Sequence, residues 1–396
     1  MDLAWHTPAS ENGFRRGTPR LNPFPAHLRV MRCPFRASFE ITSNVKDYGA
    51  VGDGVVDDSP AIQRALDSGA PVVEIPEGNY RIVTTLKVSS HTRIEAAQNA
   101  RVFSCGDTPK KQGDFLLTNS DSENGNTQIS ICGGIWDGNN TGKFNTKSPD
   151  LFAPDAWSGT VLNFFNVTNL ALENLVIANS VVYYARFGKI DNFVIRNIGF
   201  QSDTPGFNQD GLHFSGFCRN GLIENVKALT DGQTNDDMLA LNADDSMERL
   251  ENRGLMRGPI ENLTFRNVFA ENCYTAIRML SVTAPIRNIR FENIRCGCRN
   301  YAINMDAARY CRTPLFDEKK YSNGVGDISN IVIDGMEVWK TSERDVPLIV
   351  NETNSENITV RNFRRAIERD KCPETPTIVT RNTIPRTTSF RDEMFQ

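Results

Sequence analysis

TNLALENLVI, residues 168–177, contains the phrase that decides the fold: an Asn, alternating apolar positions, a second Asn and further alternation. The phrase returns six times along the chain, as DNFVIRNI, NGLIENV, NLTFRNV, NIRFENI, NIVI and NITVRN. Its first Asn stands at positions 169, 192, 220, 262, 288, 330 and 357, which gives spacings of 23, 28, 42, 26, 42 and 27 residues. A self-similar period of about 20–30 residues is typical of a solenoid, whose units bury their apolar faces against one another.

Alternating apolar and polar positions within each copy are typical of a β-strand. Leucine-rich repeats share the period, but their Leu-x-x-Leu-x-Leu frame and helical half are absent from these copies. Asn suits a tight corner between strands, because it tolerates a left-handed backbone and hydrogen-bonds its own backbone. Corners stacked along an axis form Asn ladders. The repeat therefore predicts an all-β fold, a single-stranded right-handed parallel β-helix.

Two departures from the regular period predict features around this solenoid. The two spacings of 42 contain surplus polar sequence, at about 244–259 and 306–327, and such insertions often wall a binding site. Before the repeat, DDSP at residues 57–60 places an N-cap and a proline at the start of a helix that we expect to reach about Ser68. A solenoid needs a cap over its first coil, and this short helix is the natural candidate.

The pattern divides the chain into three expected segments. Residues 1–40 are rich in Pro, Arg and Asn, and we expect a poorly ordered arm there. This stretch has no positive region followed by ~7–15 apolar residues, so no secretory signal is predicted. Residues 41–365 are expected to form a catalytic β-helix, and residues 366–396 a tail that packs on it or caps it.

Composition restricts the partners. The net charge is −4 and no Lys/Arg run stands out among the 396 residues, so a nucleic-acid partner is disfavoured. No apolar stretch approaches the ~20 residues of a membrane helix, so no membrane partner is expected. Nine scattered cysteines are an odd number and predict stacked core thiols rather than a disulfide framework. Cys296, Cys298 and Cys311 fit no usual zinc spacing, and neither a metal nor a cofactor is predicted.

An acidic constellation is the strongest chemical signal. Asp210 lies in the segment NQDG, and Asp236 and Asp237 lie in the segment NDD, 26 residues later. Adjacent coils sit about 4.8 Å apart, so three carboxylates one period apart converge on one surface. Like charges this close raise at least one pKa, which allows one carboxyl to act as an acid and another as a base. A single Asp at a turn is more often structural, but the clustering of three favours a site.

These motifs resemble a known family. Residues 45–82 look like the opening of the pectin lyase-like superfamily, and the later coils resemble the polygalacturonases of glycoside hydrolase family 28, over about residues 44–363. Members carry Asn-x-Asp-Gly and, one coil later, an Asp-Asp pair. The resemblance implies an inverting glycoside hydrolase with a carbohydrate substrate, Asp236 as general acid, and Asp210 and Asp237 activating a water. Inverting enzymes separate their carboxyls by about 6.5–9.5 Å. Relatives are commonly secreted.

Two coils depart from the family pattern. Where members have Gly-His-Gly, residues 273–281 read CYTAIRMLS, and Arg278 would occupy that surface. Where members grip a uronate with Arg-Ile-Lys, residues 302–306 read AINMD, so galacturonate specificity is not predicted. The candidate substrate-binding residues are Arg278, His213, Asn208, Asn304 and Asp306. His213 faces outward if its neighbours face the core, and an ordinary surface histidine is the alternative.

Other interpretations stay open at this point. A polysaccharide lyase or epimerase on the same scaffold would hold Ca²⁺ with the acidic cluster and use Arg278 as base. A non-catalytic, glycan-binding β-helix is a further alternative, since fold does not fix function. Trp136, Trp157 and the pair Tyr183-Tyr184 could stack on sugars, although such residues more often pack in a core. Asp244 and Asp245 could be simple loop charges.

Overall fold

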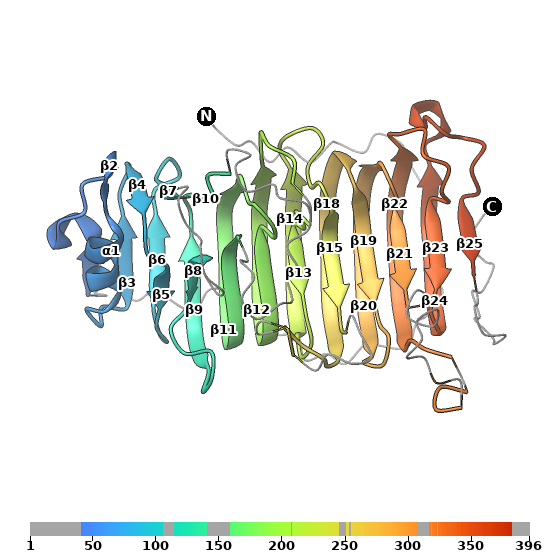
Figure 1. The fold of residues 1–396 in the computed structure, drawn as a ribbon, viewed down its shortest axis with the longest axis horizontal. Coiled ribbons are helices and arrows are strands. Elements are labelled where there is room, and N and C mark those ends of the chain that lie inside the picture. Colours follow the sequence, from blue (N-terminus) through green and yellow to red (C-terminus); the bar gives the residue numbers. More distant parts are fainter. Residues whose placement is uncertain are drawn as a thin grey trace, which may run out of the picture. The chain divides into compact units, whose positions relative to one another are not determined.

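The computed structural model describes residues 41–105, 115–140, 159–206, 208–244, 251–252, 255–307, 317, 319–322 and 324–381, with the backbone alone at 251–252 and 255–256. Residues 1–40, Trp157, Cys311 and residues 382–396 lie outside this part, so the predictions made for them have no counterpart below. All described strands but one short antiparallel pair stack in parallel as coils of one right-handed β-helix (Figure 1), as the repeat predicts.

Three columns of parallel strands form the walls of the coils. The first column comprises β1 (Thr42–Asn44), β3 (Val72–Ile75), β6 (Arg93–Ala96), β9 (Asn126–Cys132), and then the long strands β11 (Thr160–Ala178), β12 (Ala185–Gln201), β14 (Arg219–Ala228), β18 (Ile260–Cys273), β20 (Ile286–Cys298), β22 (Ile328–Lys340) and β24 (Ser355–Arg365). The second comprises β2 (Asp53–Asp57), β4 (Asn79–Ile82), β7 (Arg101–Ser104) and β10 (Ile135–Asp137), which pairs with the end of β11. Long strands therefore run around a corner from one wall to the next.

The third column carries the candidate site. It comprises β5 (Leu86–Val88), β8 (Phe115–Asn119), the first residues of β11 and β12, and then β13 (Leu212–Phe214), β15 (Asp237–Asn242), β19 (Thr275–Leu280), β21 (Ile303–Asp306), β23 (Ile349–Glu352) and β25 (Ile378–Thr380). Because β25 pairs in register with β23, the column continues past residue 365 into the segment that we expected to be a tail. A short antiparallel pair, β16 (Glu251–Asn252) with β17 (Leu255–Met256), projects from the coil after β15.

Asparagines turn the corners, as the sequence predicts. The repeated Asn residues have left-handed backbones, with φ near +55°. Most donate from the side-chain amide to the Asn one coil earlier, over 2.5–3.2 Å, in two ladders. Asn220 and Asn362 donate to Asp191 and Asp334 instead. One ladder contains Asn174, Asn197, Asn225, Asn267 and Asn293, and the other contains Asn169 with Asn192 and then Asn220, Asn262, Asn288, Asn330 and Asn357. Stacked amides thus satisfy one another where the chain bends.

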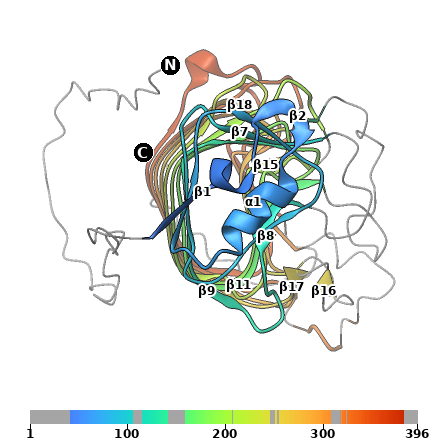
Figure 2. The same ribbon diagram turned by 90° about the vertical axis from the view of Figure 1, so that its left-hand side faces the viewer.

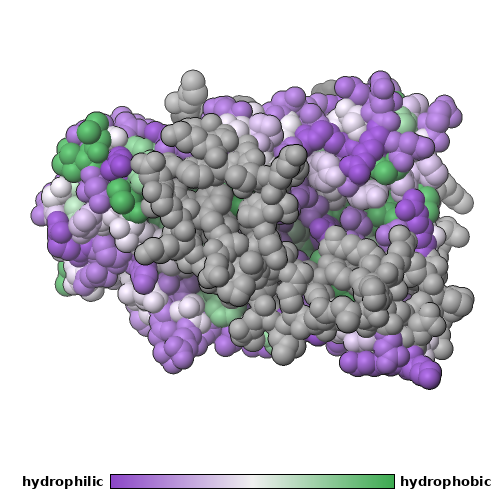
Figure 3. Space-filling view, in the orientation of Figure 1, coloured by the Kyte–Doolittle hydropathy of each residue, from purple (hydrophilic) through white to green (hydrophobic). Residues whose placement is uncertain are grey.

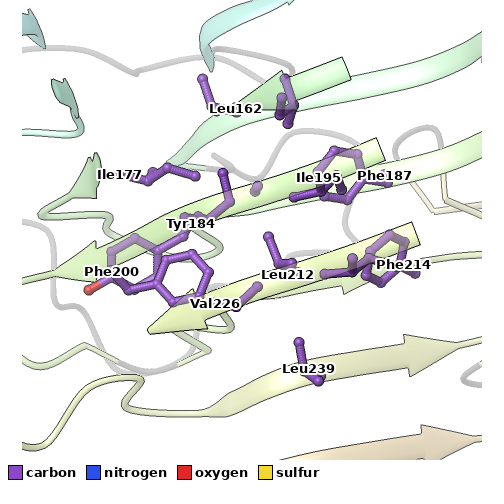
Figure 4. Packing of buried hydrophobic residues seen from close by; sticks show 14 of the residues in the cluster. Leu162, Ile177, Tyr184, Phe187, Ile195, Phe200, Leu212, Phe214, Val226 and Leu239 are labelled. Carbon is purple, nitrogen blue, oxygen red and sulfur yellow. The ribbon is translucent and has the colours of Figure 1, made fainter. Parts of the chain in front are cut away.

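The interior is a stack of apolar side chains, one layer per coil (Figure 4). Phe164, Phe187, Phe214, Phe265 and Phe291 follow one another along the axis, with ring centroids 5.0–6.4 Å apart. Aromatic pairs in this range contribute about 0.5–1.5 kcal/mol each beyond the area they bury. Trp136 is fully buried in the same core, and Tyr183 and Tyr184 are buried too, so packing rather than sugar stacking explains all three.

A short helix, α1 (Ser59–Leu66), covers the first coils, and Figure 2, which looks along the stack, shows it across their opening. Its apolar face packs into the core, which confirms the predicted cap although the helix ends before Ser68. The carboxylate of Asp58, at the N-cap position, does not cap the helix and accepts from the backbone of Val51 and Gly52. Asp57 accepts the Ser59 N–H instead.

The described outer surface is mostly hydrophilic in the view of Figure 3. Within the described part of the chain, no helix is long and apolar enough to cross a membrane. Two 3-10 helices complete the elements among the described residues: η1 (Val45–Tyr48) and η2 (Ile367–Arg369). Four of the described cysteines are buried thiols, as the sequence predicts: Cys218, Cys273, Cys296 and Cys298.

Candidate active site

The third column aligns the site residues by register. Leu212, Leu239 and Ile277 are partners on β13, β15 and β19 and fill the core. The next position along each strand faces away from the core, and it places His213 and Arg278 two coils apart on one face. Strand alternation therefore decides which side chains reach this surface.

A glycine brings two acidic coils together. The Gly211 N–H donates to the carbonyl oxygen of Asp237, over 2.9 Å. A Cβ on Gly211 would lie 2.5 Å from the carbonyl oxygen of Met238 and 2.7 Å from the ring of Phe200. Only glycine fits this approach, so the Asp-Gly pair is a packing requirement that sets Asp210 against the Asp-Asp pair.

The three carboxyls of Asp210, Asp236 and Asp237 converge. One oxygen from each lies within 4.8 Å of the others, which is about the rise of one coil. Asp210 and Asp237 are buried, and Asp236 is partly exposed. The oxygens are closer than the separation of about 6.5–9.5 Å expected for an inverting pair, so that part of the expectation is not met by the nearest atoms.

Burial raises the pKa of each carboxyl, and the neighbouring acids raise it further. The pKa of Asp236 rises to about 7 through burial and the charge of Asp210, and that of Asp237 to about 7 through burial and the charge of Asp236. Burial and the charge of Asp237 lift the pKa of Asp210 well above its usual range. The positive charge of Arg278 opposes all three shifts.

Basic side chains are distributed unequally among the acids. His213 Nδ1 lies 2.6 Å from Asp210 Oδ2, and its ring stacks on Tyr183 with centroids 4.3 Å apart. Arg278 donates to Asp237 Oδ2 from Nη1, over 3.5 Å. Among the described residues, no Lys, Arg or His side chain forms an ion pair with Asp236. Asp236 is therefore the carboxyl whose proton is least displaced by a positive neighbour.

The remaining candidate residues surround this cluster. Arg278 also donates from Nη2 to Asp306 Oδ2, over 3.0 Å, and Asp306 is buried behind it. Asn304 is the register partner of Arg278 on the next coil and is partly exposed. Asn208 has a left-handed backbone, and its N–H helps to lower the pKa of Asp236. All eight candidate residues thus lie on neighbouring coils of one wall or on the loops leading into it.

Two residues have contacts that the sequence does not specify. Tyr183 is buried, as such residues more often are, and it packs against the His213 ring, a contact that only the register of β12 and β13 reveals. Asp244 is not a simple loop charge, because its carboxylate accepts from the backbone N–H groups of Val282, Thr283 and Ala284. It anchors the start of the first insertion. Residues 245–250 and 253–254 of that insertion, Asp245 included, and residues 308–316 of the second lie outside the described residues.

Comparisons with known proteins agree with this architecture. Residues 42–181 match a family model described as rhamnogalacturonase A/epimerase, pectate lyase-like. The family 28 exopolygalacturonase of Yersinia enterocolitica superposes with a TM-score of 0.53 at 16% identity, over 89% of this chain and 80% of that one. Residues 42–181 thus resemble that pectate lyase-like family, and the chain has the fold of a parallel β-helix. The iota-carrageenase of family GH82 from A. fortis gives a TM-score of 0.63 at 13% identity, over 94% and 96% of the two chains.

Curated relatives of this chain differ in activity. Probable rhamnogalacturonase C of Aspergillus flavus is 24% identical over 340 residues, 81% of this chain and 64% of that protein. Plasmin and fibronectin-binding protein A of Streptococcus pneumoniae is 27% identical over 207 residues, 49% of this chain and 25% of that protein. The chain spans less than two thirds of either relative. The structural likenesses show the fold alone, because one fold carries many functions.

Proposed function

We propose that the protein is a glycoside hydrolase that cleaves a polysaccharide or oligosaccharide at the Asp210, Asp236 and Asp237 cluster. The observation that carries the proposal is the unequal pairing of three converging carboxyls: two contact a basic side chain and the third does not. Hydrolysis of a glycosidic bond needs one protonated and one ionised carboxyl side by side. A basic neighbour favours the ionised form of Asp210 and of Asp237, and Asp236 has no such partner among the described residues.

The roles follow from the contacts. Asp236, partly exposed and with a pKa of about 7, gives its proton to the glycosidic oxygen as the bond to the sugar breaks. Asp237, held by Arg278, takes a proton from the water that attacks the sugar, and Asp210 orients that water from the coil before. The water oxygen forms the new bond to the sugar, and one water proton passes to Asp237. The proton from Asp236 leaves on the oxygen of the departing group.

The substrate class is a plant-type or microbial glycan. The match to a probable rhamnogalacturonase over 81% of this chain supports a pectic polymer. On β21, however, Asn304 and Asp306 stand where family 28 would place two cations, and Asp306 is already engaged by Arg278. We therefore propose a glycan whose recognition does not require a galacturonate carboxylate at that position.

A lyase or epimerase is the second candidate, and one observation favours it: the same three carboxyl oxygens are close enough to hold a divalent cation. The family model's description also includes an epimerase and a pectate lyase-like fold. The ion pairs of Arg278 with Asp237 and Asp306 weigh against this candidate, because two carboxylates stabilise the charged guanidinium and a general base must be uncharged.

The experiment is a panel of pectic, alginate, carrageenan and neutral glycans, incubated with the protein and with its Asp236→Asn variant. A hydrolase releases saturated reducing ends and is indifferent to chelator. A lyase releases products that absorb as unsaturated uronates and loses activity in chelator. Proton NMR of the first product gives the stereochemistry, which the short carboxyl separation leaves for measurement. Binding without cleavage of any glycan would contradict the proposal and favour the non-catalytic alternative.

A further inference from the structure

Arg299 lies two coils beyond the β14–β15 loop that leads to Asp236, yet its guanidinium holds that loop. Nη1 donates to the carbonyl oxygen of Gly232, over 3.0 Å. Nη2 donates to the carbonyl oxygen of Thr234, over 3.4 Å, and to Oδ1 of Asn235, over 2.8 Å. These three contacts lie within the four residues that precede Asp236. The guanidinium therefore grips the backbone from which the proposed acid projects.

The same side chain is fixed by the coil in between. Nη1 also donates to the carbonyl oxygen of Asn272, over 2.9 Å, and the Arg299 N–H donates to the carbonyl oxygen of Cys273, over 2.8 Å. Three successive coils thus meet at one partly buried guanidinium. Five N–H donors in a planar fork make this possible, whereas a lysine ammonium has three donors at one point.

The other supports of the loop explain why this grip matters. Asn235 donates from Nδ2 to the carbonyl oxygen of Gly206, over 2.8 Å, and Tyr184 donates to Gln233 Oε1, over 2.9 Å. Both of those partners lie toward the N-terminal end of the stack. From the opposite side, the Tyr274 N–H donates to the carbonyl oxygen of Thr234, over 2.9 Å, and Arg299 adds the three side-chain contacts described above. The loop is therefore held between the preceding and the following coils.

We propose that Arg299 is a positioning residue for the site: it sets the β14–β15 loop so that Asp236 and Asp237 face the glycosidic bond. The inference rests on the proposed function, because it assigns Arg299 to the orientation of that acid and base. A displacement of about 1 Å in a reacting group can cost about 10²-fold in rate. Loss of the guanidinium therefore acts on the chemical step more than on the affinity for the glycan.

The test compares Arg299→Lys and Arg299→Met with Arg365→Lys. Arg365 is a matched control, because its guanidinium also donates to backbone carbonyls, those of Cys372 and Thr375, but it fastens the turn at those residues. We expect kcat to fall about 10- to 100-fold in both Arg299 variants with little change in KM. Arg365→Lys keeps the wild-type kcat. Amide hydrogen exchange at residues 229–237 accelerates in the Arg299 variants alone.

Each outcome decides the proposal. Wild-type kcat and wild-type exchange in both Arg299 variants would overturn it, and so would equal acceleration across the whole chain in the Arg299 and Arg365 variants. If the wild-type protein cleaves no glycan, the proposed function fails, and the exchange comparison still shows whether Arg299 holds the loop. Accelerated exchange with an unchanged kcat would mean that the loop is held but Asp236 is not aimed by it, which also overturns the proposal.

Discussion

Two stacks of charged residues lie on neighbouring walls of the β-helix, and the register pairs opposite charges in one and brings like charges together in the other. One, which we call the charge ladder, runs along the first column at a single position of successive coils: Glu173, Arg196, Glu224, Arg266, Glu292, Asp334 and Arg361. Signs alternate along it except between Glu292 and Asp334, and there Arg290 pairs with both acids. Every carboxylate in the ladder has an arginine beside it.

The candidate site breaks this rule. Its three carboxyls come within 4.8 Å of one another, and two basic side chains contact them. Asp210 and Asp237 are also more buried than most of the ladder residues and therefore less solvated. The comparison shows that a solenoid sets the charge environment of each residue by what stands one coil away. A carboxylate with an arginine one coil away stays ionised, whereas carboxyls that outnumber their basic neighbours have raised pKa values and hold protons near neutral pH.

The largest effect should come from the carboxyl without a basic partner. Asp236→Asn removes the proposed proton donor, and we expect kcat to fall about 10³-fold on the glycan that the panel identifies. Asp334→Asn, which changes a carboxylate of the charge ladder, should leave kcat unchanged. Release of reducing ends measures both, and an Asp236→Asn variant as fast as wild type would remove Asp236 from the mechanism.

Arg278→Met should have the next largest effect. It leaves Asp237 and Asp306 without their shared cation, so the pKa of Asp237 rises and less of the base is ionised. We expect kcat/KM to fall about 10²-fold near neutral pH and to recover partly at higher pH. Arg266→Met in the charge ladder is the matched control. A pH profile of both variants checks this, and a parallel, unshifted profile for Arg278→Met would contradict it.

The pH profile expected for the wild-type protein under the proposed function follows from the same pKa shifts. Asp236 must hold its proton, and its pKa is about 7, so kcat/KM should decline as pH rises above about 7. Asp237 must lose its proton, and its pKa of about 7 brings the acidic limb close to the alkaline one. We therefore expect a narrow, bell-shaped profile. A plateau extending to pH 9 would show that Asp236 is not the acid.

Stability should change more modestly and in the opposite direction from activity. A carboxyl whose folded pKa is raised stabilises the folded state below its unfolded pKa of about 4, and this contribution is lost as pH rises through the folded pKa of about 7. At pH 8 the wild-type Asp236 carboxyl is ionised in a buried position, which disfavours the folded state. Asn cannot ionise, so the Tm of Asp236→Asn at pH 8 should exceed that of wild type by a few degrees. At pH 4 the two should agree. Scanning calorimetry at both pH values measures the difference.

The smallest effect belongs to the charge ladder. Arg196 pairs with Glu173 over 2.7 Å and with Glu224 over 3.9 Å, and its side chain is 29% exposed. Solvent screens such pairs, so Arg196→Met should lower the free energy of unfolding by no more than about 1 kcal/mol and leave activity intact. Urea denaturation measures this, and a loss of several kcal/mol would mean that the ladder is as tightly coupled as the site.

The fold was predictable because one residue type carries the corner geometry. Asn at recurring positions predicted both the coil period and the ladders, and alternation predicted the inward layers. The helix cap was predicted from DDSP, but the role of Asp58 was not. Its carboxylate binds the backbone of Val51 and Gly52, a contact that depends on how the chain folds back before the first coil.

The site was predictable only where residues follow the period. Asp210 and Asp236 lie one coil apart in sequence, so their meeting could be inferred. Arg299 lies 64 residues after Asn235, across coils of unequal length, and no spacing points to their contact. The lengths of the insertions determine how many residues separate such partners, so only the strand register in the structure identifies them.

The turn held by Asp244 bears on how such a protein can diversify. The carboxylate ties the departure of the first insertion to three backbone amides on the following coil, and β18 then rejoins the stack in register with β14. The insertion could therefore change in length while its first residue and the coils on either side keep their positions. Related proteins could therefore differ in this insertion, and with it in ligand preference, while keeping the same stack of coils.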